Sequence, residues 1–199
     1  MAARISDTIK KDHYDLDTYY KTIINTNDPD EQQRFQNKFV WELARHAVGE
    51  ELVVYPAMEK YLRDGLEMAD KDRHDHQIVK EQLKRFQDMH LTNSQFIPTI
   101  KALMKDLRKH IEDEEQIDLV KLESAITPEE SQRLSKSFSR TKMFVPTRAH
   151  PSAPNKPPLP DGVWVDDCAR RPVDGYVSGM ARGCEGSSMR ARTRFRMDV

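Results

Sequence analysis

The stretch His46-Ala47-Val48-Gly49-Glu50-Glu51 decides the fold, because it sets an imidazole and a carboxylate four residues apart. Residues four apart lie one above the other on a helical face, so His46 and Glu50 point in the same direction. The run His110-Ile111-Glu112-Asp113-Glu114-Glu115 repeats this spacing. Apolar residues at helical intervals precede both runs, so we expect both pairs to face the interior of a helical protein.

Two further histidines lie on apolar stripes of the same kind. His13 shares its stripe with isoleucines and Leu16, and His76 shares its stripe with valine, leucine and phenylalanine. The step from His13 to His46 is 33 residues and the step from His76 to His110 is 34. This pattern predicts two helical hairpins with the same arrangement, in which one helix carries a lone histidine and the next carries a His-x-x-x-Glu pair. His74 competes with His76 but points to roughly the opposite side of the helix, so we expect it in solvent.

These donors predict a metal site. Buried carboxylates and imidazoles are costly without partners, and a shared cation would satisfy them together. Imidazole with carboxylate suits iron, zinc or manganese, and iron is the usual metal for such pairs inside a helical bundle. The candidate metal ligands are His13, His46, Glu50, His76, His110 and Glu114.

The apolar periodicity predicts an all-α protein. We expect long helices over residues 6–24, 29–63, 68–90 and 94–124, with Ile117 on the inner face of the last one. Pro56 lies inside the second helix, and the missing proline N–H predicts a kink just after the His46 and Glu50 pair. Thr127-Pro128-Glu129-Glu130 is a capping box that predicts a short fifth helix.

Composition indicates an intracellular, cytoplasmic protein. The chain has 199 residues, of which 33% are charged and 37% hydrophobic. An uninterrupted apolar run of about 18 residues is missing, so no membrane contact is expected. The N-terminus lacks the apolar core of a secretory signal. Cys168 and Cys184 have no metal-binding spacing, and we interpret them as free thiols in a reducing compartment.

The chain divides into three parts by composition. Residues 1–125 form the helical domain, and residues 126–160 form the short helix and a Pro-rich segment that is extended along the surface or disordered. Residues 132–160 carry six basic and no acidic residues. Residues 161–199 lack periodicity and are interpreted as a disordered tail. Their scattered arginines are weak evidence for nucleic acid, which the sequence does not favour as a partner.

At this point the pattern resembles the hemerythrin-like, HHE cation-binding family over about residues 1–125. Residues 138–158 also resemble an extension seen in fungal members. The motifs that carry the resemblance are Asp12-His13, His46-x-x-x-Glu50-Glu51 followed by Tyr55-Pro56, Asp75-His76-Gln77 and His110-x-x-x-Glu114-Glu115.

The resemblance implies an up-down four-helix bundle around an oxo- or hydroxo-bridged non-haem di-iron centre. The six candidate residues would be its ligands, and Glu50 and Glu114 could bridge the two metals. Whether Glu51, Asp72 or Glu115 also ligate stays open. Tyr20, Tyr55 and Tyr61 are candidate hydrogen-bond donors around the site.

The sequence also departs from the oxygen-carrying members of the family. Those members use a fifth histidine one turn from the lone histidine of the third helix, where this chain has Asp72 and Lys80. They also end on His-x-x-x-x-Asp, where this chain offers Glu115 at the matching position and Glu114 beside it. A site richer in carboxylate should favour ferric iron and react with oxygen or peroxide rather than hold oxygen unchanged.

Two classes of function follow from this pattern. The first is a metal protein that binds, senses or detoxifies iron, oxygen or peroxide, with a small ligand such as oxygen or peroxide. The second is a helical scaffold that binds a protein partner, of unknown identity, through its basic Pro-rich segment. An enzymatic role is not favoured, because no glycine-flanked serine appears and both cysteines lie far from the histidines.

Overall fold

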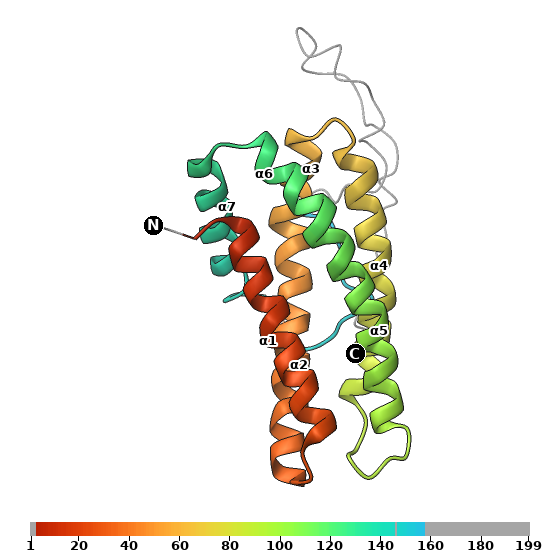
Figure 1. The fold of residues 1–199 in the computed structure, drawn as a ribbon. Coiled ribbons are helices and arrows are strands. Elements are labelled where there is room, and N and C mark those ends of the chain that lie inside the picture. The colour runs from red at the N-terminus through yellow and green to blue at the C-terminus, as the bar shows by residue number, and fades with distance from the viewer. Residues whose placement is uncertain (1–2, 146, 158–199) are drawn as a thin grey trace, which may run out of the picture. The chain divides into compact units, whose positions relative to one another are not determined.

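The computed structural model describes residues 3–145 and 147–157, and within them every regular element is a helix. Helices α1, α2, α4 and α5 run alternately up and down and form a four-helix bundle, beside which the shorter α7 lies (Figure 1). The predicted all-α bundle with a fifth helix is therefore confirmed. The elements in chain order are α1 (Ile5–Asn25), α2 (Pro29–Gly49), η1 (Glu50–Val54), α3 (Tyr55–Tyr61), α4 (Gly65–Gln87), α5 (Phe96–Asp113), η2 (Glu114–Asp118), α6 (Leu119–Ala125) and α7 (Pro128–Thr141). The predicted disordered tail, residues 161–199, lies outside the described residues.

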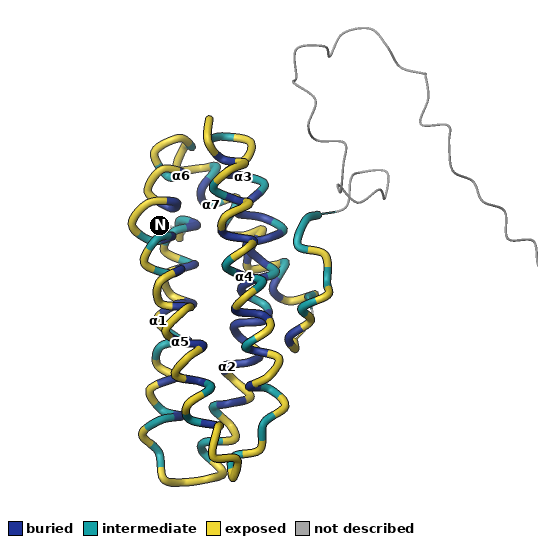
Figure 2. The backbone as a smooth tube through the Cα atoms, turned by 90° about the vertical axis from the view of Figure 1, so that its right-hand side faces the viewer, coloured by how far each residue is buried: buried dark blue, intermediate teal, exposed yellow. Residues whose placement is uncertain are grey.

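The interior consists of two apolar clusters with a buried polar layer between them. Along α1, for example, Ile5 and Ile9 belong to one cluster and Leu16 belongs to the other. Asp12 and His13 lie between them and are also buried. Buried residues face the space between the helices along their length (Figure 2). The apolar stripes hold the helices together, because burying such side chains contributes about 25 cal/mol for each Å² removed from water.

Two π-helical segments follow the two His-x-x-x-Glu pairs. The segment η1 begins at Glu50 and η2 begins at Glu114. The amides of Tyr55 and Leu119 donate to the carbonyls of these glutamates, five residues back rather than four. Where the sequence predicted a kink from Pro56, the structure has a π-helical segment that ends at Val54, two residues before the proline. Such segments are rare and occur frequently at functional sites.

The second π-helical segment overturns one detail of the predicted inner face. Ile117 was expected to be buried but is 48% exposed, whereas Asp118 is buried. A π-turn inserts an extra residue and rotates the following side chains around the helix axis. A sequence pattern read with the regular helical period cannot follow this change of register.

The residues after α6 cover the bundle from two sides. Helix α7 packs against α1 and η1, and its N-cap residue Thr127 accepts a hydrogen bond from the Glu130 amide at 3.2 Å. Residues 147–157, which we call the C-terminal strap, contain turns but no helix. The strap is fixed to α4, because the Ala149 amide donates to Gln87 Oε1 at 3.0 Å and Arg73 Nε donates to the Asn155 carbonyl at 3.3 Å. Of the two alternatives for this segment, its described part follows the surface.

Over the described part of the chain, no helix is both long enough and apolar enough to cross a lipid bilayer.

Candidate metal centre

All six candidate metal ligands lie in the buried polar layer. Each one is at most 4% exposed. They come from all four long helices of the bundle, because α1 and α4 each supply one histidine and the two His-x-x-x-Glu pairs run from α2 into η1 and from α5 into η2. His74, in contrast, is exposed, as its position on the outer side of α4 predicted.

Four of the six residues form a first group of donors. One donor atom from each of His13, His46, Glu50 and Glu114 lies within 4.8 Å of the others. The Nε2 atoms of His13 and His46 are 3.1 Å apart. His46 Nε2 also lies 3.0 Å from Glu50 Oε1, and His13 Nε2 lies 3.3 Å from Glu114 Oε2. Two nitrogens that each lie about 2.1 Å from one ion are about 3.0 Å apart when they subtend a right angle at the ion, as in an octahedral site, so this spacing suits a shared cation.

A second group of donors shares one residue with the first. Glu50, His76 and His110 again offer donor atoms within 4.8 Å of one another. The Nε2 atoms of His76 and His110 are 3.0 Å apart, and Glu50 Oε2 lies 3.3 Å from His76 Nε2. Glu50 therefore directs one oxygen to each group, which is the arrangement of a carboxylate that can bridge two ions.

The carboxylates of the pocket lack the hydrogen bonds that buried carboxylates need. Both oxygens of Glu50 and both oxygens of Glu114 have no hydrogen-bond partner among the described residues. Imidazole nitrogens lie 3.0 to 3.3 Å from three of these oxygens, and they can form ion pairs with them only when the rings are protonated. Buried carboxylates without donors are strongly destabilising unless a cation balances them. The donor set and its unpaired oxygens thus fit one or two bound metal ions.

Outer carboxylates orient three of the four histidines. The Nδ1 atoms of His13, His46 and His76 lie 2.8 Å from Glu115, 3.2 Å from Asp12 and 3.3 Å from Glu51, respectively. A carboxylate can only accept, so each Nδ1 carries the hydrogen. In the neutral imidazole the Nε2 lone pair then points into the pocket. This relay from carboxylate to histidine is the usual support of a histidine that binds a metal.

Two buried lysines hold two of these outer carboxylates in turn. Lys80 Nζ donates to both oxygens of Glu51, at 2.5 and 2.7 Å. Lys142, which follows α7, donates to Asp12 and to Glu42. Both lysines are at most 9% exposed. The relays through Glu51 and Asp12 therefore each include a cationic side chain of the protein before any metal is considered.

The electrostatic environment shifts the pKa values of the pocket strongly. Burial disfavours the charged imidazolium, but Glu50 and Asp12 outweigh burial and raise the pKa of His46 to about 10. Glu50 and Glu51 likewise overcome burial and raise the pKa of His76 to about 9. Burial and the neighbouring His76 lower the pKa of His110 well below its usual value. Strong shifts of this kind are concentrated at functional sites.

The pKa values of Glu114 and Glu50 are shifted in opposite directions. Burial and the charge of Glu50 raise the pKa of Glu114 to about 7. Burial also disfavours ionised Glu50, but the charges of His46 and His76 lower its pKa well below the usual value. The pocket without a metal therefore keeps Glu50 ionised by means of protonated histidines.

The structure gives different positions to the three carboxylates whose role as ligands the sequence left open. Glu115 and Glu51 lie outside both donor groups and support histidines instead, whereas Asp72 is grouped with Asp75 and His110.

Of the three candidate tyrosines, Tyr55 lies at the pocket. The Tyr55 hydroxyl lies 2.9 Å from His76 Nε2. Tyr61 donates to Glu130 on α7 and is not part of the pocket.

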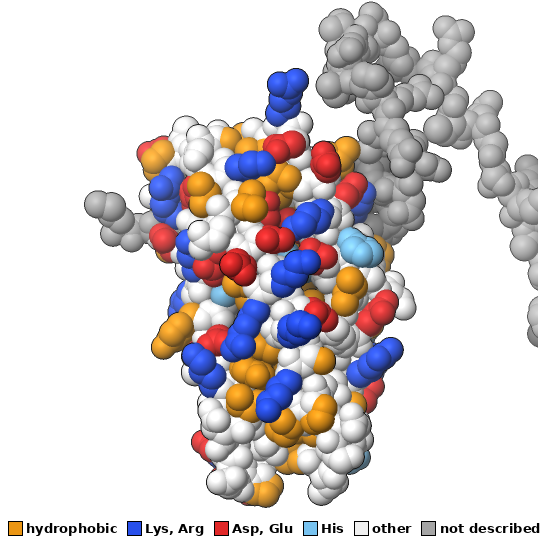
Figure 3. Space-filling model, turned by 45° about the vertical axis from the view of Figure 1, so that its right-hand side comes forward, with side chains coloured by type: hydrophobic (Ala, Val, Ile, Leu, Met, Phe, Trp, Pro, Cys, Tyr) orange, Lys and Arg blue, Asp and Glu red, His pale blue; other side chains and the backbone are white. Residues whose placement is uncertain are grey.

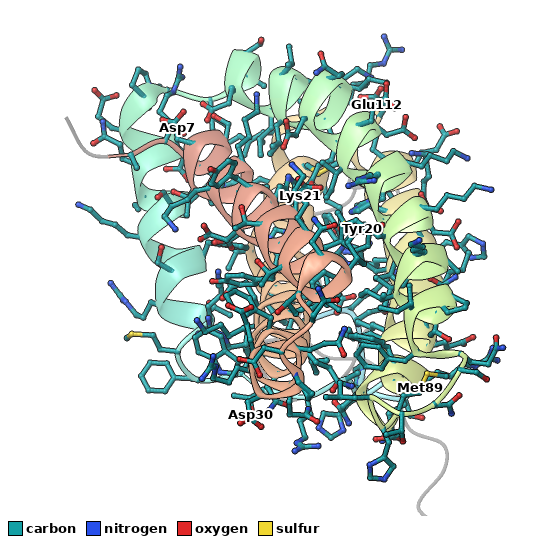
Figure 4. All side chains as sticks on the ribbon, turned by 60° about the horizontal axis from the view of Figure 1, so that its bottom comes forward. Asp7, Tyr20, Lys21, Asp30, Met89 and Glu112 are labelled. Atoms are coloured by element: carbon teal, nitrogen blue, oxygen red, sulfur yellow. The ribbon has the colours of Figure 1, made fainter. Side chains whose placement is uncertain are left out.

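Sequence reasoning missed the roles of Lys80 and Lys142. Lysine at an inner helical position is a weak signal, because a long side chain can reach solvent from most positions. The partners of Lys142, Asp12 and Glu42, are 130 and 100 residues away in the chain. The Tyr20 ring lies 5.0 Å from the Arg108 guanidinium. In Figure 4 Tyr20 lies on α1, towards α5.

Comparison with known proteins gives a consistent result. The family model "Hemerythrin HHE cation binding domain" matches residues 4–122. An uncharacterised hemerythrin-like protein of Schizosaccharomyces pombe is 58% identical over 157 residues, which cover 78% of this chain and 77% of that protein. A protein of Nostoc named DNA nickase is 21% identical over 145 residues, which cover 72% of this chain and 40% of that protein. The search of solved structures found no match.

Proposed function

Because this chain belongs to the hemerythrin HHE cation-binding family, we propose that it binds two iron ions in the buried pocket and uses them to bind or respond to oxygen or peroxide. The observation that carries the proposal is the position of Glu50, which belongs to both donor groups. A carboxylate that directs one oxygen to each of two neighbouring donor sets has little use in a pocket built for a single ion.

The proposed ligand sets follow from the two groups of donors. His13, His46, Glu50 and Glu114 would hold one ion. Glu50, His76 and His110 would hold the other. The second set has fewer protein donors, so the second ion keeps open positions for a small ligand. Iron is the proposed metal because mixed imidazole and carboxylate ligands in helical bundles suit it, and zinc or manganese would fit the same donors.

Bound iron would supply redox chemistry and a position for oxygen or peroxide, and the protein would supply the surroundings. The apolar clusters on both sides of the polar layer exclude water from the pocket. The outer carboxylates fix the ring orientation of His13, His46 and His76. Tyr55 places a hydroxyl at the edge of the second donor set, where it can donate a hydrogen bond to a small ligand.

Metal analysis of the purified full-length chain tests the proposal. The metal-free protein would be titrated anaerobically with ferrous iron, and we expect about two equivalents to bind. Mössbauer spectra of an iron-57 sample exposed to air should then show ferric ions coupled to one another. A chain that stays free of metal and is equally heat-stable with and without ferrous iron would contradict the proposal. That result would favour the scaffold function instead, since a bound metal stabilises the folded state.

A further inference from the structure

A third group of donors lies between the buried pocket and the surface of the bundle. Asp72, Asp75 and His110 each offer a donor atom, and these atoms lie within 4.8 Å of one another. Asp75 and His110 also line a surface pocket of about 180 Å³ between α4 and α5, together with Asp106 and Lys109. His110 is thus shared, because its Nε2 lies 3.0 Å from His76 Nε2 inside the second donor set.

Asp72 gives independent evidence that this group has a ligand. Its side chain is 1% exposed, and neither carboxylate oxygen has a hydrogen-bond partner among the described residues. The Nδ1 of His110 also lacks a partner there, unlike the Nδ1 of the other three histidines. The nearest ammonium group, Lys71 Nζ, is 3.9 Å from Asp72 and is held by Asp113 at 2.9 Å. An unpaired buried carboxylate beside an unpaired imidazole nitrogen suits a bound cation.

We propose that Asp72, Asp75 and His110 form an uptake site, at which a divalent cation from solvent is held before it moves to the second donor set. This inference rests on the proposed function, because it concerns how the same pocket is loaded. Asp75 is half-buried and meets the cation at the surface pocket, whereas Asp72 is buried and lies deeper. His110 then connects the uptake site with Glu50 and His76.

The charges on the face that carries α4 and α5 are mixed, so a cation needs a specific site to be held there. Acidic and basic side chains are interspersed on the face that carries α4 and α5 (Figure 3), so the surface as a whole gives little attraction for a cation. Lys109 lines the surface pocket and Lys71 lies beside it. A cation is therefore attracted by the close carboxylates of Asp72 and Asp75 rather than by the general field of the surface.

Stopped-flow loading of the metal-free full chain with cobalt(II) tests the uptake site. Bound cobalt has visible absorption bands that report coordination without oxygen chemistry. We expect Asp75→Asn to slow loading by about tenfold, while the final spectrum and the number of bound ions stay those of the unsubstituted chain. Asp72→Asn should slow loading at least as much. Asp106→Asn is the matched control, because Asp106 lines the same surface pocket but belongs to none of the donor groups found among the described residues, and it should change the rate by less than about twofold.

Three results would overturn the uptake site. If the Asp75→Asn variant loads at the rate of the unsubstituted chain, the Asp75 carboxylate has no role in uptake. Equal slowing by Asp106→Asn would show that net charge alone matters. Loss of a bound ion at equilibrium would make Asp72 or Asp75 a resident ligand instead. Failure of the proposed function looks different, because the unsubstituted chain would then take up no cobalt at all and the uptake site would fail with it.

Discussion

Lys80 and Glu51 form a buried ion pair across two helical segments, with Lys80 Nζ 2.5 Å from Glu51 Oε1 and 2.7 Å from Oε2. Glu51 Oε1 in turn lies 3.3 Å from His76 Nδ1. Lys80 lies one turn after His76, where the sequence comparison with oxygen carriers suggested that a histidine could stand. At this position the chain therefore has a lysine instead of another histidine, and this lysine supports His76 through Glu51.

Substitution of Lys80 by methionine should destabilise the metal-free protein by about 3 to 5 kcal/mol, because it removes the closest partner of the buried Glu51 carboxylate and leaves only His76 Nδ1, 3.3 Å away. Urea unfolding monitored by circular dichroism measures the loss. The double variant Lys80→Met, Glu51→Gln removes both charges and should recover much of that loss. Equal stability of the single variant and the original chain would show that Glu51 finds another partner or is protonated at little cost.

Substitution of Glu50 by glutamine should reduce the number of bound ions from two to one or none, because an amide is a poor bridge between two cations. The count comes from metal analysis after anaerobic loading and buffer exchange. Glu112→Gln is the matched control, because Glu112 also follows a histidine of the pocket but is exposed. Figure 4 shows Glu112 on the outer side of the bundle. Two ions in the Glu50→Gln variant would exclude Glu50 as the bridging ligand.

Metal binding should release protons and should strengthen as pH rises. The pKa of His46 is raised to about 10 and that of His76 to about 9, chiefly because nearby carboxylates overcome burial. Both imidazoles are therefore protonated at neutral pH in the metal-free protein, and a metal must displace those protons. Below about pH 9, each released proton raises the apparent affinity up to about tenfold for each pH unit.

Calorimetric titration with zinc in buffers of different ionisation enthalpy counts the protons released. The control is His74→Gln, because His74 is exposed and the substitution should leave the proton count unchanged. An affinity that is constant between about pH 6 and about pH 8 would contradict protonated histidines in the pocket.

Substitution of Gly49 by alanine should weaken the packing of α7 on the bundle. A Cβ atom at this position would lie 2.7 Å from Phe138 Cε2, and Phe138 is fully buried. Overpacking of this kind typically costs about 1 to 3 kcal/mol. Thermal unfolding should show the loss, and Phe138→Leu in the same chain should relieve part of it. The Phe138 ring also lies 5.9 Å from that of His46, so the displaced α7 should weaken metal binding too. An unchanged unfolding temperature would show that α7 moves aside at no cost.

The sequence by itself determined the helical class, the four long helices and the inward direction of the six donors. The physical reason is that the helical period is local, so residues four apart share a face whatever packs against it. His46 with Glu50 and His110 with Glu114 illustrate this, since both pairs are buried as expected. The choice of His76 over His74 followed from the same period.

Tertiary structure alone decided which donors meet and what supports them. The division into two groups that share Glu50 depends on how four helices pack, and no spacing along the chain contains it. The pairs of Lys80 with Glu51 and Lys142 with Asp12 join residues 29 and 130 positions apart. The exposure of Ile117 came from a π-turn, whose extra residue breaks the period on which the sequence analysis relied. Local pattern thus fixes the direction of a side chain, whereas long-range packing fixes its neighbours.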